Sequence, residues 1–346
     1  MPRSPHPSRR GLLTLLAGAP LVAGGLSSCG VRWVSGTEPT PEPVRGPDDE
    51  AREAAVAEAR ALLHLLEPAA AGPAPLQAVA AQGVQVCRAH LTALGDEASG
   101  GTTATAAAPD AQAVVDRLTA AAGAAFTTAA RSTAGEGLSG GVARLLASIA
   151  ASRAVLAQVV ATATGAVAGP VAGEAPQATT TPSAAPTSSA GADPEAASRP
   201  ATVALQAALG GEHAAVHGYA LVVARLADPR RTEAAGDLAA HRVARDDLAD
   251  LLTARGVPPE QAAPGYDVQA PTADAAIALA AAMEDRLAGL YADVVAASAA
   301  DREPAARALL AAARGARRWG SVVLSFPGMA ELSEDGSPAP TASTTP

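Results

Sequence analysis

The sequence contains no lysine and few aromatic residues. All 25 basic side chains among its 346 residues are arginines, and Phe, Trp and Tyr together make up 2% of the chain. Without lysine the chain cannot form the Gly-x-x-x-x-Gly-Lys loop that holds nucleotide phosphates. Few aromatic rings also leave few of the side chains that dominate the energetics of protein–protein interfaces. The composition therefore excludes a P-loop enzyme and offers no obvious interaction hot spot.

One of the two cysteines, Cys29, closes a distinctive N-terminal segment. Residues 1–10 carry three arginines and no acid, residues 11–25 are small and apolar, and Leu26-Ser27-Ser28 precede the cysteine. This order resembles a bacterial lipoprotein signal, which is cleaved before a cysteine that carries a diacylglyceryl group. The apolar segment is too short for the roughly 20 residues that a bilayer core requires. We expect export, cleavage after residue 28, and anchoring to the outer face of the cytoplasmic membrane by a lipid on Cys29.

The same N-terminal segment bears on the export route and on disulfide formation. Arg9 and Arg10 also resemble a twin-arginine signal. In a chain without lysine, adjacent arginines arise easily from composition, so both export routes stay open. Once Cys29 is acylated, Cys87 is the remaining thiol and no intramolecular disulfide can form.

The net charge bears on the partners of the exported chain. Removal of residues 1–28 leaves 22 arginines against 34 acidic residues, a formal net charge of −12. Binding of nucleic acid requires a basic face, so this balance argues against a nucleic-acid partner. The membrane, reached through the lipid anchor, is the partner that the sequence predicts, and the identity of a protein or ligand partner stays open.

The chain is rich in alanine and shows helical periodicity, which predicts an all-α fold of two helical bundles joined by a disordered linker. Segments rich in Pro, Thr, Ser and Gly separate the bundles because such segments cannot bury enough apolar surface to fold. The predicted order is a signal peptide at 1–28, a tether at 29–47, an N-terminal bundle at 48–165, a linker at 166–199, a four-helix bundle at 200–328 and a disordered tail at 329–346.

Glycine and proline mark the ends of eight predicted helices. Thr272 and Asp301 are predicted as helix N-caps in the second bundle. The helices are expected at residues 49–68, 75–94, 110–134, 141–165, 200–227, 233–255, 272–299 and 301–324.

Three polar residues of the second bundle fall on the inward-facing stripes of their helices. The apolar rhythm of helix 200–227 leaves Glu212 facing inward, and that of helix 272–299 does the same for Glu284. His241 lies on the inward stripe of helix 233–255. An unpaired ionised carboxylate in an apolar core costs several kcal/mol, so each acid needs a cation, a metal or a proton.

The stretches 212–219, 240–248 and 283–291, with the final Arg317-Arg318-Trp319-Gly320, resemble a ferritin-like domain family of unknown function found in exported lipoproteins of high-GC bacteria. The resemblance covers about 200–328 and implies a ferritin-like four-helix bundle there. The family has no assigned activity that could be carried over to this chain.

Ferritin-like proteins build a di-iron site from single glutamates on two helices and a Glu-x-x-His pair on each of the other two. Glu212 and Glu284 match the single glutamates, but Leu238 stands three residues before His241 where that pattern has Glu. Helix 301–324 contains no histidine. The resemblance therefore implies an incomplete ligand set of Glu212, His241 and Glu284, with His213 and His217 as possible extras.

Arginines stand close to these positions in sequence. Arg245 lies one turn from His241, and helix 301–324 carries Arg314, Arg317 and Arg318. A guanidinium fork suits a buried carboxylate, so we expect Arg245, Arg317 and Arg318 to neutralise the two glutamates without a cofactor. The alternative is a single Fe, Mn or Zn ion held by the two glutamates and His241.

These features predict a cell-envelope lipoprotein with a binding or structural role and without catalysis. The alternative is a metal-binding redox or metal-storage protein with a reduced Glu/His site.

Overall fold

The computed structural model describes residues 45–96, 109–131, 137–173 and 198–340. These residues are predominantly helical, which confirms the all-α prediction. An isolated β-bridge between Leu332 and Pro338 is the one β feature within them. The predicted signal peptide, Cys29, most of the tether, and the predicted linker and tail beyond residues 173 and 340 lie outside the described residues.

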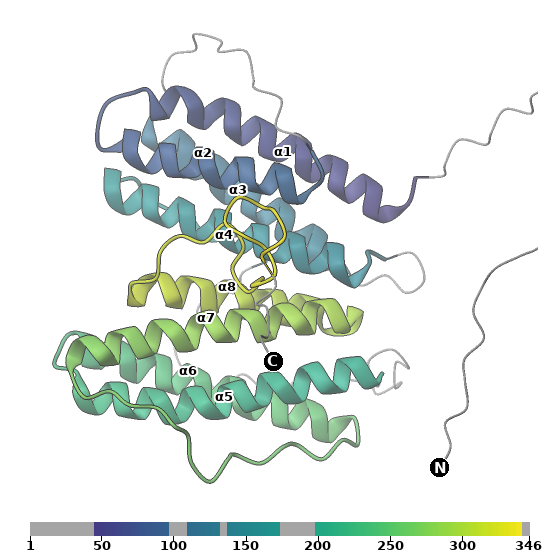
Figure 1. Ribbon diagram of the computed structural model, residues 1–346, viewed down its shortest axis with the longest axis vertical. Coiled ribbons are helices and arrows are strands. Elements are labelled where there is room, and N and C mark those ends of the chain that lie inside the picture. The colour runs from purple at the N-terminus through teal and green to yellow at the C-terminus, as the bar shows by residue number, and fades with distance from the viewer. Residues whose placement is uncertain (1–44, 97–108, 132–136, 174–197, 341–346) are drawn as a thin grey trace, which may run out of the picture. The chain divides into compact units, whose positions relative to one another are not determined.

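Within this part of the chain there are eight α-helices, close to the predicted bounds (Figure 1). They are α1 (Pro47–Ala70), α2 (Leu76–Ala93), α3 (Ala111–Ala129), α4 (Gly140–Thr164), α5 (Arg199–Arg225), α6 (Arg230–Ala254), α7 (Ala273–Ala297) and α8 (Arg302–Trp319).

The helices pack as two sets of four that share a contact face. In the first set α1 packs on α2 and α3 on α4, and in the second set α5 packs on both α6 and α7, while α7 packs on α8. Helix α4 also packs on α7 and α8, and Figure 1 shows it on the side of its set that faces them. The two predicted bundles are therefore in direct contact through α4.

The composition of α4 explains why this helix packs against both sets of helices. It is long and apolar enough to cross a membrane by length and composition alone, but 83% of its apolar window is buried inside the protein. Ser148 and Ser152 are also buried on it, and their hydroxyls donate to the carbonyls of Pro327 and Leu324, each over 2.8 Å. We interpret α4 as a core helix that both sets share.

Residues 329–340 differ from the disordered tail that we predicted. The Arg144 guanidinium on α4 pairs with Glu331 over 2.7 Å, and the backbone N–H of Ser325 donates to Glu334 over 2.7 Å. Gly336 adopts a φ of +85° where the chain passes close to the carbonyl of Ala89 on α2. A polar composition predicts a loop, but it does not reveal whether that loop finds hydrogen-bond partners on the core.

The predicted linker also begins later than expected. Val171 is buried, and the N–H of Val167 donates to the side chain of Gln112 on α3 over 3.0 Å. Residues 166–173 therefore pack on the first set of helices.

The ends of α7 and α8 can be compared with the caps and bounds predicted for them. Thr272 caps α7 as predicted, with its hydroxyl accepting from the N–H of Ala275 over 3.1 Å. Asp301 does not cap α8 through its side chain, because the carboxylate accepts two hydrogen bonds from Arg255, of 2.6 and 2.8 Å. Helix α8 ends at Trp319 and not at 324, since Gly320 turns the chain with a φ of +113°.

Candidate functional site

Two glycines allow α5 and α7 to cross closely. Gly211 lies against Leu290, and Gly218, seven residues later, lies against Met283, seven residues earlier on α7. A Cβ atom at either glycine would collide with its partner side chain. This register makes α5 and α7 antiparallel and brings their inward-facing polar residues within reach of each other.

Each of these two helices carries a glutamate followed seven residues later by a tyrosine. The Tyr291 hydroxyl on α7 donates to Glu212 Oε1 on α5 over 2.5 Å. The Tyr219 hydroxyl on α5 donates to Glu284 Oε1 on α7 over 2.6 Å. All four side chains are buried. The site is therefore built from two matching Glu–Tyr pairs that connect the helices in both directions.

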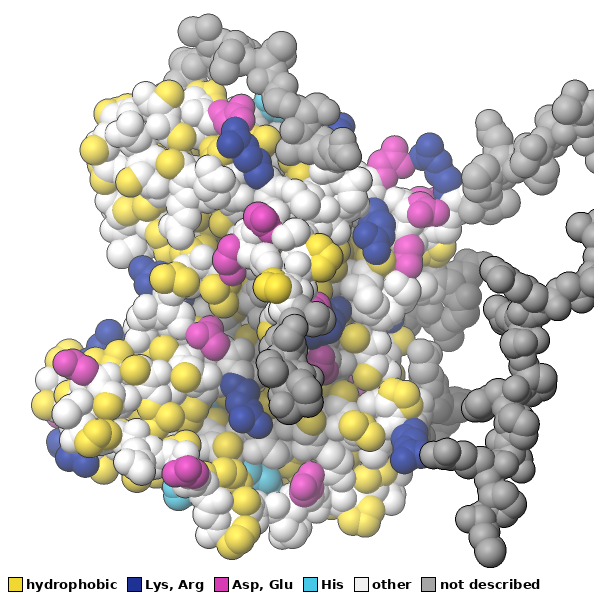
Figure 2. Space-filling view, viewed as in Figure 1, with side chains coloured by type: hydrophobic (Ala, Val, Ile, Leu, Met, Phe, Trp, Pro, Cys, Tyr) yellow, Lys and Arg dark blue, Asp and Glu magenta, His cyan; other side chains and the backbone are white. Residues whose placement is uncertain are grey.

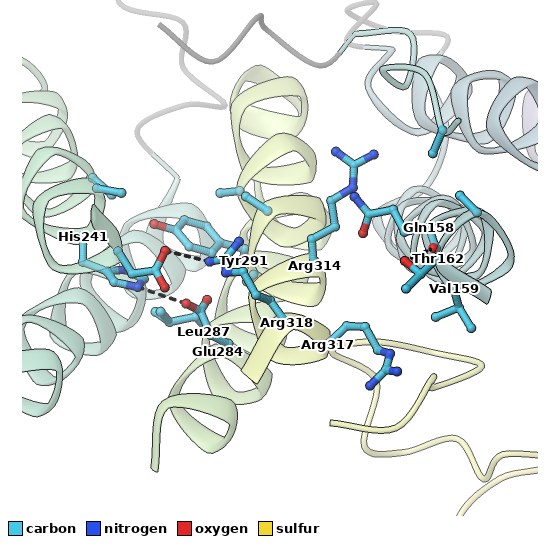
Figure 3. Close-up of a pocket in the computed structure, with 18 of the residues that line it drawn as sticks. Gln158, Val159, Thr162, His241, Glu284, Leu287, Tyr291, Arg314, Arg317 and Arg318 are labelled. Atoms are coloured by element: carbon cyan, nitrogen blue, oxygen red, sulfur yellow. Dashed lines mark hydrogen bonds and ion pairs between the residues drawn. The ribbon is translucent and has the colours of Figure 1, made fainter. Parts of the chain in front are cut away.

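His241 on α6 joins the two pairs (Figure 3). Its Nδ1 lies 2.8 Å from Glu212 Oε2 and its Nε2 lies 3.3 Å from Glu284 Oε1. Its ring stacks on Tyr219, with 4.9 Å between ring centroids and 28° between planes. The structure thus brings together the three polar residues that the helical pattern placed inward, and it connects them by hydrogen bonds. We call Glu212, Tyr219, His241, Glu284 and Tyr291 the central network.

The charge of the network follows from His241. Burial lowers the pKa of this imidazole, but its hydrogen bonds to Glu212 and Glu284 and the negative charges of these carboxylates outweigh that effect and raise its pKa to about 10. The ring is then an imidazolium at neutral pH and donates through both nitrogens. Burial, followed by the adjacent carboxylates, raises the pKa of Tyr219 and of Tyr291, so both hydroxyls stay protonated donors.

Arg245 and Arg317, which we expected to neutralise the glutamates, bind elsewhere. The guanidinium of Arg245 pairs with its neighbour Asp246 over 2.7 Å, and Arg317 donates to the backbone carbonyl of Ser321 over 3.0 Å. That prediction was wrong because His241 and the two tyrosines, which are shorter and more rigid than arginine, already donate to three of the four carboxylate oxygens. Helical periodicity gives the direction of a side chain but not the position of its end.

Arg318, the third predicted partner of the two glutamates, lies next to the central network but is not hydrogen-bonded to it. It pairs with Asp237 on α6 over 2.6 Å, and Trp319 Nε1 donates to the same carboxylate over 2.8 Å. Burial lowers the pKa of Arg318, but the charges of Asp237 and Glu284 outweigh that effect and raise it. Arg318 therefore lies in the field of Glu284 and has its ion pair with Asp237.

His213 and His217 do not join the central network. His213 Nε2 lies 3.2 Å from the backbone carbonyl of Glu260, and the His217 ring packs on Tyr266 with 5.1 Å between centroids. A step of one residue on a helix turns the side chain by about 100°, which carries His213 away from the face of Glu212. The prediction of these two histidines as extra ligands was wrong.

The described residues do not fit the di-iron centre that the resemblance implies. Both nitrogens of His241 are engaged by the glutamates. Helix α8, where a further ligand would be needed, presents Gly315, and a Cβ atom there would lie 2.6 Å from Glu284 Cδ. Within the described ranges no three His, Cys, Asp or Glu side chains are arranged to hold a metal ion. We therefore derive no step through a metal.

A cavity of about 930 Å³ opens above the central network. Helices α6 and α8 lie on either side of the cavity, and their backbones stay apart, although Arg318 and Trp319 on α8 reach Asp237 on α6. Glu212, His241, Glu284 and Tyr291 form part of the cavity lining, and the C-terminal half of α4 lines it from the other set of helices. In Figure 3, Arg314 and Arg317 extend from α8 toward Gln158, Val159 and Thr162 of α4.

Tyr219 and Tyr291 were missed as functional residues. Both lie on the inward stripes of their helices, where the helical pattern alone does not distinguish a tyrosine from an ordinary apolar core residue. The signal that identifies them is the repeated spacing Glu-x6-Tyr on two helices, since a step of seven residues returns to nearly the same face.

Cys87 and Ser139, two side chains that could act as nucleophiles, have structural roles. Burial raises the pKa of the Cys87 thiol to about 11, which leaves it unreactive at neutral pH. Residues 137–141 have the spacing Gly-x-Ser-x-Gly, but Ser139 is the N-cap of α4 and its hydroxyl accepts from the N–H of Val142 over 3.4 Å. It does not follow a strand, as the nucleophile of a serine hydrolase does.

Comparison with known proteins gives a family without an assigned activity. Residues 204–331 match a family model described as a domain of unknown function, DUF4439. A crystal structure of a conserved hypothetical protein from Mycobacterium tuberculosis is similar, with 39% sequence identity over 35% of this chain and 94% of that chain, and a TM-score of 0.34. No protein of curated function matches the chain.

Proposed function

We propose that this protein is a non-catalytic ligand-binding lipoprotein of the cell envelope, built on a ferritin-like bundle whose metal centre is replaced by a hydrogen-bonded network. The observation that carries the proposal is the position of His241 between Glu212 and Glu284. An imidazolium there supplies the positive charge that a metal ion supplies in a ferritin-like centre. Its two ring nitrogens also donate one hydrogen bond to each of the two glutamates.

The network argues for binding and against catalysis. A catalytic metal site needs an open coordination position, and a general base needs a free carboxylate or imidazole. Both Glu212 oxygens accept hydrogen bonds, and so does Glu284 Oε1, while both nitrogens of His241 donate. The cavity next to the network, in contrast, has the volume of a small-molecule site.

The proposed location rests on the N-terminal sequence. Acylation of Cys29 would tether the folded helices to the membrane, because burial of acyl chains contributes about 0.8 kcal/mol per CH₂ group. The test is phase partitioning of the full chain expressed with its export signal. The wild-type protein should enter the detergent phase and the Cys29→Ser variant should stay in the aqueous phase. Equal partitioning of the two forms would refute the anchor.

The surface charge supports a partner other than nucleic acid. Figure 2 shows acidic and basic side chains interspersed on the face in view. The formal net charge of the whole chain is −9. The face in view therefore does not offer the continuous basic surface that phosphate backbones require.

Elemental analysis tests the metal-free centre. The full chain is loaded with Fe(II), Mn(II) or Zn(II), dialysed, and analysed beside a Glu212→Gln, Glu284→Gln double variant. We expect well under one ion per chain for both proteins. Near-stoichiometric metal in the wild type that is lost in the double variant would instead establish the metal-binding redox or storage function.

A further inference from the structure

The cavity has a wall of guanidinium groups. Arg314, Arg317 and Arg318 lie within five positions on α8 and all line it. Arg318 is paired with Asp237, whereas Arg317 has a backbone carbonyl as its hydrogen-bond partner and no carboxylate within the residues that the structure describes. At least one positive charge on this wall is therefore left without an acidic partner there, in a chain whose net charge is negative.

The central network contains two carboxylates and one imidazolium, a net charge of −1, but no ion pair joins it to Arg317. Three of the four carboxylate oxygens of Glu212 and Glu284 accept hydrogen bonds from His241 and the two tyrosines, and neither glutamate is hydrogen-bonded to Arg317. Figure 3 shows Arg314 and Arg317 extending away from the network, toward α4. The guanidinium of Arg317 therefore lies on the α8–α4 side of the cavity, apart from the carboxylates of the network.

Small apolar side chains form much of the remaining lining, together with the polar Gln158 and Thr162 on α4 and Asp237 on α6. Val159 and Ala161 on α4 lie across the cavity from Ala308, Ala311 and Ala312 on α8. Small side chains leave space for the apolar body of a ligand, and burial of that body strengthens binding by about fourfold per methylene group. Guanidinium groups match the planar oxygens of a carboxylate, and they bind phosphate and sulfonate in the same way.

We infer that this cavity binds a small amphipathic anion, with an acidic head group at Arg317 on the α8 wall and an aliphatic body against the alanine and valine side chains of α4 and α8. This inference rests on the proposed binding function and adds the chemical class of the ligand. The negatively charged head group distinguishes it from a neutral or cationic amphiphile of the same length.

The experiment is isothermal titration of decanoate into the full chain carrying Cys29→Ser, in EDTA and below the critical micelle concentration. We expect one site per chain. Decyltrimethylammonium, whose head group has the opposite charge, should bind at least tenfold more weakly, and octanoate, with two methylene groups fewer, about sixteenfold more weakly than decanoate. This comparison needs no change in the cavity and so does not depend on the folding of any variant.

Two variants locate the site. Arg317→Gln should weaken decanoate binding at least tenfold by removing the charge, and Ala311→Trp should do so by filling the cavity. Arg242→Gln, on the exposed face of α6, is the matched control and should change nothing. Equal affinity for decanoate and decyltrimethylammonium, or unchanged decanoate binding in both cavity variants, would overturn the inference. Because EDTA is present throughout, metal at the central network would change the elemental analysis and not these titrations.

Discussion

The hydroxyl of Tyr291 on α7 donates a hydrogen bond of 2.5 Å to Glu212 on α5, and both side chains are buried. The same contact is made in reverse by Tyr219 and Glu284 over 2.6 Å. A buried carboxylate is tolerated when its oxygens accept hydrogen bonds, so each tyrosine offsets the cost of burying the glutamate on the neighbouring helix.

Removal of this hydroxyl should therefore destabilise the protein. We predict that Tyr291→Phe lowers the free energy of unfolding by about 1–3 kcal/mol, because it leaves Glu212 Oε1 buried without a donor. Urea denaturation followed by circular dichroism measures the change. Tyr266→Phe, which removes a hydroxyl in an exposed contact, is the control and should change stability by less than about 0.5 kcal/mol. An equal effect of the two substitutions would show that the hydrogen bond contributes nothing.

The sequence was sufficient to predict the helices and the inward direction of Glu212, His241 and Glu284, because both depend on periodicity along a single helix. It was not sufficient to identify their partners. Whether Arg245 or Tyr291 reaches Glu212 depends on the crossing distance of α5 and α7, which is set by tertiary packing. For the same reason the contact of α4 with the second set was missed, since a helix that is apolar all round does not reveal which neighbour covers each face.

Stability should depend on pH through His241. Its pKa is about 10 in the folded protein and close to 6.5 when unfolded, so the folded state holds the proton more tightly between these values. The stabilisation is fully present below pH 6.5 and is lost as the pH rises toward 10. We predict that the free energy of unfolding falls by a few kcal/mol between pH 6.5 and pH 8.5, as measured by urea denaturation at intervals of 0.5 pH.

The control for this pH profile removes the titrating group. His241→Gln should lower stability at pH 6.5 and flatten the profile between pH 6.5 and 8.5. His64→Gln, an exposed change on α1, should keep the wild-type slope. If His241→Gln keeps that slope as well, another group is responsible for it.

Gly315 should be intolerant of a side chain although it lies inside a helix. Alanine is favoured over glycine within helices by about 1 kcal/mol, so replacement of a helical glycine normally stabilises. At Gly315 the new Cβ would lie 2.6 Å from Glu284 Cδ and 2.8 Å from both of its carboxylate oxygens. We predict that Gly315→Ala lowers the free energy of unfolding by about 1–3 kcal/mol, as expected for overpacking.

Gly236 provides the matched comparison for this substitution. It lies within α6, and a Cβ atom added there would meet no other atom within 4 Å. Gly236→Ala should raise the free energy of unfolding by about 0.5–1 kcal/mol. If thermal and urea denaturation showed both substitutions to be stabilising, α8 would not be packed against Glu284 as closely as described.

Arg153 on α4 is fully buried and yet poorly satisfied. Its Nη1 donates to the carbonyl of Ala121 over 3.3 Å, and its Nε and Nη2 find no hydrogen-bond partner among the described residues. Burial lowers its pKa, which is the signature of a charge held at a cost. A buried ionic group without good partners is often replaced by an apolar side chain at no loss. We therefore predict that Arg153→Met raises the free energy of unfolding by about 1 kcal/mol.

Arg255 is the contrasting case, because its guanidinium makes two hydrogen bonds, of 2.6 and 2.8 Å, to the buried carboxylate of Asp301. Arg255→Met should lower the free energy of unfolding by about 3 kcal/mol, since it leaves that carboxylate without its cation. Both substitutions remove one charge and keep a long aliphatic stem, so their difference isolates the effect of the partner. Equal losses of stability in the two variants would show that Arg153 has a favourable partner that the packing of α3 and α4 does not reveal.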